Sequence, residues 1–495
     1  MITGYTAQAI RSAEEPLLAA GEALMQRAAR ALAGRIAERL RTREEPRLLV
    51  LAGRGANGGD ALHAAAILRR EGTGIDVIAT GDDLHVEGED ALRAAGGTVH
   101  ALSDLGPEDL HERLADADLV LDAMVGLGGR PEIPARLAPL LETVRRSGVP
   151  VLAVDLPSFV DATTGRAASG ALPAVETVTF GAVKAGLLLP GGAELAGDLH
   201  LVGIGVEDQL PVQPAVQRLE SADVAALWPH PGREASKYTR GVVAIAAGSP
   251  RFPGAAVLAA SGAARSGAGM VRLIAPQEVL DLVLHTRPEV IGHPSTHIDL
   301  EEIGRTQALV VGPGLSGEDP RTRDGVDILA VGGDLERGVI DAGGLDALTA
   351  DHRFGQHVVL TPHRGEAERI AARLDVDPGL PGADLAPALA AVTGATVLLK
   401  GAITLIAPGD GGPLRAQDDA TSQLATAGTG DVLAGALGTL LAAGLDGPDA
   451  AAAAAILHGR AGLLASSGGR LPLVALDVAD RLPAALGAIL TDALS

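Results

Sequence analysis

Four residues in the last quarter of the chain have the types and spacing that phosphoryl transfer needs. Gly428-Thr429-Gly430-Asp431 directly precedes an Ala-rich stretch with the character of a helix. Backbone amides at a helix start can stabilise the charge of a transferring phosphoryl group. A carboxylate on the first helical turn, such as Asp431, can take the proton from an attacking hydroxyl. The segment therefore predicts an anion site with Asp431 as its base.

Two more polar residues of this half stand where apolar runs end. His363 follows the run VVLT at 358–361, and Lys400 ends the run VLLK at 397–400. A lone histidine is more often a structural residue than a functional one, and the neighbouring Gly-rich loops favour a functional one here. We expect both side chains at the edge of the sheet where the strands end and ligands gather.

A second group of candidates lies in the first half. The run LLVLA at 48–52 leads into Gly53–Asp60 (GRGANGGD) and then an Ala-rich helix, a turn that suits an anion. Asp122 and Asp155 end further apolar runs, and Ser158 follows the second. Each feature alone has a plain explanation, a tight turn or a helix cap. Together, the oxygens of Asn57, Asp122 and Ser158 could hold a hard cation.

Rare residue types fall in or beside these segments. Of 40 basic residues only three are lysine, Lys184, Lys237 and Lys400, and Asn57 is the sole asparagine. A compositional bias toward Arg and against Asn explains why Lys and Asn are rare. It does not explain why they are kept at these four positions. A compact ammonium or an uncharged amide that Arg or Asp cannot replace is the functional explanation.

Parallel sheets must position these residues. Apolar β-type runs alternate with Ala-rich helical stretches along the whole chain, which predicts α/β architecture with sheets covered on both faces. Ligands gather at the carboxyl ends of such strands. A proline-containing, aperiodic segment at 211–220 predicts two domains, 1–215 and 220–495. Residues 7–43 read as two helices that cap the first domain or build an oligomer.

The bulk composition excludes several classes of protein. A formal net charge of −22 argues against a nucleic-acid partner. The chain has no cysteine, which rules out disulfides and thiol catalysis. We find no signal peptide and no apolar run long enough for a membrane span. We expect a cytoplasmic homo-oligomer that acts on small molecules.

The first half resembles the YjeF N-terminal domain, the NAD(P)HX epimerase family, over roughly residues 5–210. Four motifs carry the resemblance in order: GRGANGGD, DAMVGLGG, DLPS and TFGAVKAGL. It implies a Rossmann-like three-layer domain that inverts the C6 hydroxyl of hydrated NADH and NADPH, with Asp122 handling the proton. It implies a potassium ion held by Asn57, Asp122 and Ser158. The substrate contacts that it implies are Ala56, Asn57, Gly58, Gly59, Asp60, Gly126, Leu127, Gly128, Gly129, Arg130, Pro131, Glu132 and Asp155.

The second half resembles the ADP-dependent NAD(P)HX dehydratases, a branch of the ribokinase-like superfamily, over about residues 228–490. The motifs are KYTRG, GPGL, TPHRGE, KGAIT and LATAGTGDVLAG. The resemblance implies a ribokinase-like α/β domain in which ADP, with Mg²⁺, phosphorylates the C6 hydroxyl after Asp431 deprotonates it. Phosphate is then lost and AMP remains. The implied contacts to the hydrated nucleotide are Ala255, Gly314, His363 and Asp431. Those to the adenine nucleotide are Lys400, Gly401, Ala402, Ile403, Thr404 and Gly430.

The chain departs from both patterns at a few positions. Ala56 replaces the first Asn of the NNGGD segment, and Phe159 stands where Gly is usual. Gly343 replaces an acid of the usual DADxLN. Two alternatives therefore stay open: a ribokinase-like small-alcohol kinase fused to a Rossmann-like binding domain, and a first half that binds without catalysis.

Overall fold

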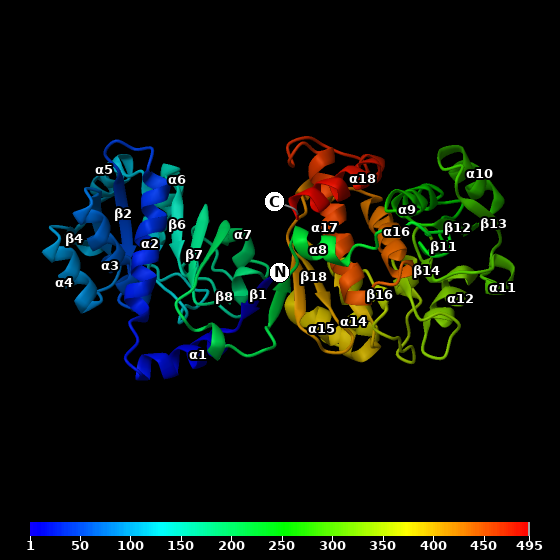
Figure 1. The fold of residues 1–495 in the computed structure, drawn as a ribbon, viewed down its shortest axis with the longest axis horizontal. Coiled ribbons are helices and arrows are strands. Elements are labelled where there is room, and N and C mark those ends of the chain that lie inside the picture. Colours follow the sequence, from blue (N-terminus) through cyan, green and yellow to red (C-terminus); the bar gives the residue numbers. More distant parts are fainter. Residues whose placement is uncertain (494–495) are drawn as a thin grey trace. The chain divides into compact units, whose positions relative to one another are not determined.

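The computed structural model describes residues 1–493. The chain divides into two compact units: Ile2–Val216 form the first, while Met1 groups with the residues from Gln217 onward in the second. Both units are built from parallel strands and helices (Figure 1), so the predicted α/β class is confirmed.

The first unit is a doubly wound parallel sheet. Its seven strands lie in the order β4-β3-β2-β5-β6-β7-β9, and β1 pairs with β8 beside them. The strands are β1 (Ile2–Tyr5), β2 (Arg47–Ala52), β3 (Gly74–Ala79), β4 (Thr98–Ala101), β5 (Leu119–Ala123), β6 (Val151–Val154), β7 (Glu176–Phe180), β8 (Val183–Lys184) and β9 (Asp198–Val202). The helices are α1 (Ala7–Ala19), α2 (Leu24–Leu40), α3 (Ala56–Arg70), α4 (Val86–Ala94), α5 (Pro107–Asp116), α6 (Ala138–Ser147) and α7 (Gly192–Ala196).

Alternate residues of β2 build two separate cores. Leu48 and Val50 pack with residues of α2 and α3, whereas Leu49 and Leu51 pack with residues of α5 and α6. Strand side chains alternate between the two faces of a sheet, so a continuous apolar strand needs cover on both sides. This arrangement gives the three layers that the sequence predicts.

The strand order reverses between β2 and β5. From β2 the chain moves outward to β3 and β4, then returns to β5 and continues to β6. In doubly wound sheets the crevice at this switch point is the usual ligand site. The loops after β2, β5 and β6 carry the first-half candidates, and parallel pairing brings those loops to one edge.

The second unit contains a nine-stranded run in the order β13-β12-β11-β14-β15-β16-β17-β18-β19, parallel up to β17 and antiparallel beyond it. The strands are β10 (Val216–Arg218), β11 (Val242–Ala246), β12 (Met270–Ala275), β13 (Ile291–Pro294), β14 (Ala308–Val311), β15 (Gly338–Ile340), β16 (Val358–Leu360), β17 (Thr396–Leu399), β18 (Thr404–Ala407) and β19 (Leu414–Gln417). The helices are α8 (Ser221–Leu227), α9 (Gly254–Arg265), α10 (Gln277–Thr286), α11 (Leu300–Ile303), α12 (Pro320–Leu329), α13 (Gly343–Asp346), α14 (Arg364–Arg373), α15 (Gly382–Thr393), α16 (Thr429–Ala442), α17 (Gly447–Ala465) and α18 (Ala475–Asp492).

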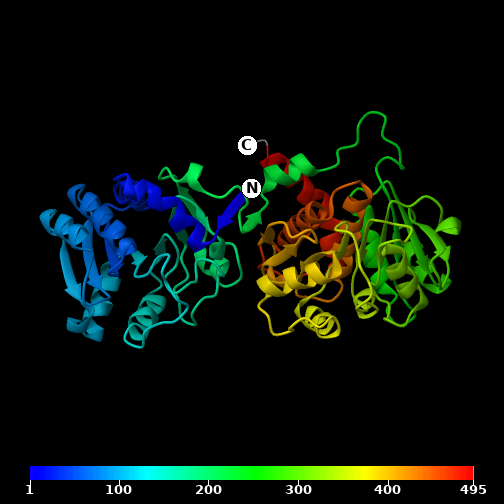
Figure 2. The ribbon, with the colours of Figure 1, turned by 90° about the horizontal axis from the view of Figure 1, so that it is seen from below.

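Two helical layers cover the sheet of the second unit. Helices α9, α16, α17 and α18 pack on one another in one layer, and α12 to α15 form the other (Figure 2). Small residues permit the tight contact between α9 and α16. A Cβ atom at Gly435 would lie 2.0 Å from the carbonyl oxygen of Ala259. The small residues therefore let the backbones of α9 and α16 come into direct contact.

Within residues 1–493, none of the helices combines the length and the apolar character that crossing a bilayer requires.

Candidate active sites

Backbone packing fixes the Gly-rich turn of the first unit. A Cβ atom at Gly53 would lie 1.9 Å from the carbonyl oxygen of Met124, and one at Gly58 would lie 2.0 Å from that of Gly53. Any side chain at these positions would push the backbone apart. The turn therefore holds the start of α3, at Ala56, directly against the loop that follows β5.

A cavity of about 190 Å³ lies beside this turn. Glu14 of α1 and apolar residues of α1 and α2 form its outer wall. Helices α1 and α2 therefore do more than cap the first domain, because their residues also form part of the wall of the candidate site. Six of the predicted contacts line the cavity together: Ala56, Asn57, Asp60, Gly126, Leu127 and Asp155.

The remaining predicted contacts lie elsewhere. Gly58 packs against the Gly-rich turn itself, and Gly59 packs against the start of α4, where a Cβ atom would lie 2.8 Å from the His85 ring. Pro131 and Glu132 line a different hollow, together with Arg145 of α6. Gly128, Gly129 and Arg130 belong to the turn between the two, which a hydrogen bond of 2.8 Å from Gly129 N to Gly126 O closes.

Asn57 is buried without a partner. It is 7% exposed, and neither its Oδ1 nor its Nδ2 makes a hydrogen bond to any of residues 1–493. Leaving a buried amide unsatisfied costs about 1–3 kcal/mol. Its close neighbour is Gly126, where a Cβ atom would lie 3.1 Å from that of Asn57. The unsatisfied amide thus points to a ligand or an ion beside it.

Asp122 and Ser158 form a buried hydrogen-bonded pair. Ser158 donates to the Asp122 carboxylate through its hydroxyl and, at 2.9 Å, through its amide. The Ser158 hydroxyl also accepts from the amide of Val125 at 3.0 Å. Burial raises the pKa of Asp122 above its ordinary value, although the bonds from Ser158 and Met124 oppose the shift. Asp122 is 0% exposed and does not line the cavity.

A buried ion pair orients Asp155. The amine of Lys184, fully buried, donates to the Asp155 carboxylate, to Thr179 Oγ1 at 3.1 Å and to the carbonyl of Phe180 at 2.9 Å. Asp155 has a φ of +68°, a region that costs a non-glycine residue roughly 1–2 kcal/mol. Strain of this kind is common where a side chain must face a ligand. Lys184 therefore positions Asp155 rather than meeting the ligand itself.

Asp60 is the more deeply buried of the two cavity acids, Asp60 and Glu14, that have no hydrogen-bond partner among residues 1–493. Its carboxylate accepts no hydrogen bond from any described residue, and it is 9% exposed. Burial and the negative charges of Asp155 and Glu14 raise its pKa to about 8, against the opposing charge of Lys184. Burial also raises the pKa of Glu14. The cavity thus carries a carboxyl group that is protonated at neutral pH.

In the second unit, His363 caps a helix. Its Nδ1 accepts hydrogen bonds from the amides of Gly365 and Glu366 at 3.1 and 3.3 Å, and its own amide donates to the Glu366 carboxylate at 2.8 Å. This is a capping box for α14. His363 nevertheless remains exposed, so the capping role leaves its ring open to a ligand.

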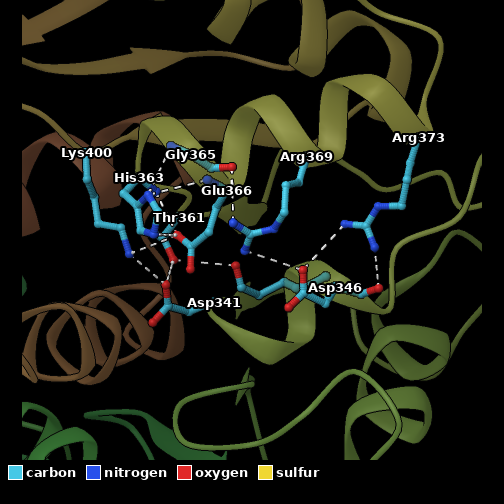
Figure 3. Close-up of polar contacts among 10 residues, drawn as sticks. Asp341, Asp346, Thr361, His363, Gly365, Glu366, Arg369, Arg373 and Lys400 are labelled. Carbon is cyan, nitrogen blue, oxygen red and sulfur yellow. Dashed lines mark hydrogen bonds and ion pairs between the residues drawn. The ribbon is translucent and has the colours of Figure 1, made fainter. Parts of the chain in front are cut away.

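Lys400 joins the ends of three neighbouring strands (Figure 3). Its amine lies 3.0 Å from Asp341 Oδ1, which follows β15, and 3.9 Å from the carboxylate of Glu366. Thr361, after β16, donates to the same Asp341 oxygen at 2.8 Å. Burial alone lowers the pKa of Lys400, but the surrounding carboxylates raise it overall. Lys400 therefore carries a positive charge at neutral pH.

The Asp431 segment lies beside this amine. A Cβ atom at Gly430 would lie 3.5 Å from Lys400 Nζ. Burial and the charge of Asp341 raise the pKa of Asp431 to about 7, while Lys400 opposes the shift. The Asp431 carboxylate accepts no hydrogen bond from the described residues. The start of α16 therefore combines free amides, a cation and a carboxylate that titrates near neutral pH.

Two predicted contacts meet at the turn after β14. Gly314 has a φ of +67°, and a Cβ atom there would lie 2.6 Å from that of Ala255. Ser249 Oγ donates to the Gly314 carbonyl at 2.8 Å. Of the predicted nucleotide contacts, Gly401 and Ala402 form an exposed turn between β17 and β18, with buried Ile403 and then Thr404 after it.

Sequence reasoning missed four polar residues of this unit. Asp341 opens the segment that corresponds to DADxLN, and Thr361 and Glu366 lie in TPHRGE, but these patterns alone assign the three residues no role. His458 of α17 had no sequence signal at all. Its Nε2 donates to the Thr429 carbonyl at 2.9 Å, and burial lowers its pKa to about 4. A neutral His458 therefore holds the turn that precedes Asp431. Lys237, in contrast, is exposed.

Both halves match known families. A model of the NAD(P)H-hydrate dehydratase family matches residues 243–483, and one of the YjeF-related protein N-terminus matches residues 21–186. The chain is 40% identical to a bifunctional NAD(P)H-hydrate repair enzyme of Mycobacterium leprae, across 98% of this chain and 99% of that one. The chain belongs to this family.

More distant members of the family also cover both halves. The Escherichia coli bifunctional NAD(P)H-hydrate repair enzyme is 31% identical over 90% of this chain and 86% of its own length. A Bacillus subtilis ADP/ATP-dependent NAD(P)H-hydrate dehydratase, co-crystallised with ATP and Mg²⁺, matches with 30% identity and a TM-score of 0.48. That match covers 54% of this chain and 97% of the Bacillus protein.

The structure gives local reasons for two departures from the family pattern. Phe159 takes the left-handed conformation, with a φ of +69°, that the usual glycine would adopt, and its ring is buried in the core under α5 and α6. A Cβ atom at Gly343 would lie 2.2 Å from the Leu315 carbonyl oxygen. Because that backbone fills the space, an acid at 343 does not fit this chain's turn.

Proposed function

We propose that the chain repairs hydrated NADH and NADPH, with an epimerase in the first unit and an ADP-dependent dehydratase in the second. The observation that carries the proposal is the cluster at the start of α16, where the Lys400 amine lies beside Gly430 and Asp431. A cation and free helix amides suit the phosphates of ADP. A carboxylate that titrates near pH 7 suits removal of a proton from the C6 hydroxyl.

The dehydratase chemistry follows from the leaving group. Asp431 accepts the proton as the C6 oxygen attacks the terminal phosphorus of ADP, and AMP departs. The C6–O bond then breaks, and phosphate leaves far more readily than hydroxide would. A proton is lost from C5, the C5=C6 double bond forms, and the dihydropyridine ring is restored. We assign the hydrated nucleotide to Ala255, Gly314, His363 and Asp431, and ADP to Lys400–Thr404 and Gly430. Mg²⁺, which prefers phosphate and carboxylate oxygens, supplies charge neutralisation on the nucleotide.

For the epimerase we propose that the 190 Å³ cavity receives the hydrated nicotinamide. Its acid, amide and strained aspartate line a space that apolar residues of α1 and α2 border on the outer side. The buried, unpartnered Asn57 amide suits a potassium ion, and the family resemblance adds the oxygens of Asp122 and Ser158 as further ligands. When bound, the ion supplies a fixed positive charge that orients an anionic substrate.

Two acids are candidates for proton transfer at C6. Asp122 follows from the resemblance, but it lies outside the cavity lining and its hydrogen bonds are satisfied. Asp60 lines the cavity, and a pKa of about 8 keeps it able to donate. Comparing Asp60→Asn with Asp122→Asn separates the candidates. The variant of the proton-transfer acid loses epimerisation, and both variants retain the dehydratase as an internal control.

Two assays test the proposal as a whole. With S-hydrated NADH, ADP and Mg²⁺, the full chain should restore the near-ultraviolet absorbance of the reduced nicotinamide. Without ADP, it should equilibrate pure R and S epimers, as chromatography would show, and faster in potassium than in sodium. No recovery of absorbance would refute the dehydratase. Epimerisation no faster than in buffer would instead leave the first unit as a binding module.

The second candidate function is a kinase that phosphorylates a small alcohol. Free amides, a lysine and a carboxylate at the start of α16 serve phosphoryl transfer to other alcohols equally well. Phosphorylation of a small alcohol by ATP, with no effect on hydrated NADH, would favour it.

A further inference from the structure

A second hollow lies on the carboxyl edge of the first unit's sheet. It encloses about 870 Å³ and is lined by residues that follow β3 and β4 and by two arginines. Among them are Thr80, Asp82, Asp83, Asp104, Arg93 and Arg136. The reaction at C6 gives this hollow no role.

The hollow is one strand away from the Gly-rich turn. Thr80, at the end of β3, donates to the Ala52 carbonyl through both its amide and its hydroxyl, each at 2.9 Å. The cavity with Asn57 and Asp155 lies on the other side of that turn, toward β5 and β6. Strands lie about 4.8 Å apart, so β3 and β6 are separated by roughly 14 Å. A dinucleotide is long enough to reach across, with its pyrophosphate over the start of α3.

The charges in the hollow select its ligand. Asp82 and Asp83 lie in the loop after β3, three and four residues beyond its last residue, Ala79. Strand β3 is the second strand outward from the switch point. In doubly wound sheets an acid at this place accepts hydrogen bonds from the ribose hydroxyls of a dinucleotide. The Asp83 carboxylate makes no hydrogen bond or ion pair within residues 1–493, so it is available.

The two arginines of the hollow do not neutralise the negative charge of its acids. Glu89 pairs with Arg93 at 2.6 Å, and Asp82 lies 3.7 Å from Arg136. With Asp83 and Asp104 added, the four acids of the lining outnumber its two arginines. A phosphate on the ribose would meet this excess of negative charge, whereas free hydroxyls would not.

We infer that this hollow binds the adenosine half of the hydrated dinucleotide, with Asp82 and Asp83 on its ribose hydroxyls, so that the epimerase prefers hydrated NADH to hydrated NADPH. The inference rests on the proposed epimerase activity and adds its substrate preference. The bond from the ribose 2′-hydroxyl to a charged carboxylate forms with hydrated NADH and is lost with hydrated NADPH, which carries a phosphate at that position.

The test uses the full chain without ADP, so that the dehydratase stays silent, and follows the conversion of each R epimer by chromatography. For the wild type we expect kcat/KM to be at least tenfold higher, about 1.4 kcal/mol, for hydrated NADH than for hydrated NADPH. The double variant Asp82→Asn/Asp83→Asn should lose at least tenfold on hydrated NADH and little on hydrated NADPH. Asp83→Arg should reverse the preference.

Asp90→Asn is the matched control, because Asp90 is an exposed acid of α4 that does not line the hollow. It should behave as the wild type, and each variant should keep its dehydratase activity. Equal use of both substrates by the wild type, or a double variant with unchanged kcat/KM, would overturn the inference while epimerisation persists. A wild type that epimerises neither substrate would refute the proposed function instead.

Discussion

The charge of Asp341 should control the pH at which the dehydratase becomes active. Asp431 must be ionised to accept a proton, and its pKa is about 7. About one-tenth of it is then ionised at about pH 6 and about nine-tenths at about pH 8. Asp341 raises this pKa and also occupies the Lys400 amine at 3.0 Å. Asp341→Asn removes the repulsion and frees Lys400, and both effects lower the pKa of Asp431.

We expect the rising limb of kcat against pH to move down by about one unit in Asp341→Asn, which corresponds to about 1.4 kcal/mol. The assay is recovery of reduced nicotinamide at saturating S-hydrated NADH and ADP. The informative quantity is the pH at which kcat rises. The maximal kcat is less informative, because it also depends on the position of the Lys400 amine. Asp346→Asn, in the same segment but paired with Arg369 and Arg373, should leave the limb in place. A limb that stays or moves to higher pH in Asp341→Asn would refute the reasoning.

Three further changes test the packing around the sites. Asp60→Asn should stabilise the first unit by at least about 1 kcal/mol, or ~2–4 °C in Tm. The Asp60 pKa is raised on folding, so the wild type loses stability from about pH 4 up to about pH 8 and the gain grows over that range. Thermal scans at several pH values would show it, and a lower Tm would contradict it. Phe159→Gly should destabilise this unit by about 2–3 kcal/mol, since losing the buried ring outweighs relief of the positive φ. Urea unfolding measures this, and a variant as stable as the wild type would show that the ring packs loosely. Gly343→Ala should cost about 1–3 kcal/mol through its clash with the Leu315 carbonyl. An unchanged Tm in calorimetry would mean that the turn yields.

The α/β class and the strand-end loops were predictable because strand and helix patterns are local. Continuous apolar runs such as LLVLA predict buried parallel strands. Parallel pairing then places the loops that follow these strands at the same edge of the sheet. The pattern also explains why Asn57, Asp60 and Asp155 converge. Their loops follow β2 and β6, on either side of β5, beside the switch point of the same sheet.

What could not be predicted depends on contacts between distant segments. The partner of Lys400 is Asp341, 59 residues earlier in the chain. His458 reaches the Thr429 carbonyl only because α17 packs on α16. Similarly, nothing in the GRGANGGD motif distinguishes glycines that approach backbone, such as Gly58, from residues that line the cavity, such as Asp60. Those distinctions depend on which atoms fill the neighbouring space.

The placement of the three lysines makes the chain unusually simple for amine chemistry. Lys184 is fully buried in its ion pair and Lys400 is partly buried among carboxylates, whereas Lys237 is exposed. An acylating reagent should therefore modify the Lys237 side chain first and leave Lys184 intact until the first unit unfolds. Mass spectrometry of the acylated chain then reports unfolding of the first unit through Lys184 and nucleotide occupancy of the second through Lys400. One reaction thus gives separate signals for the two halves of a single polypeptide.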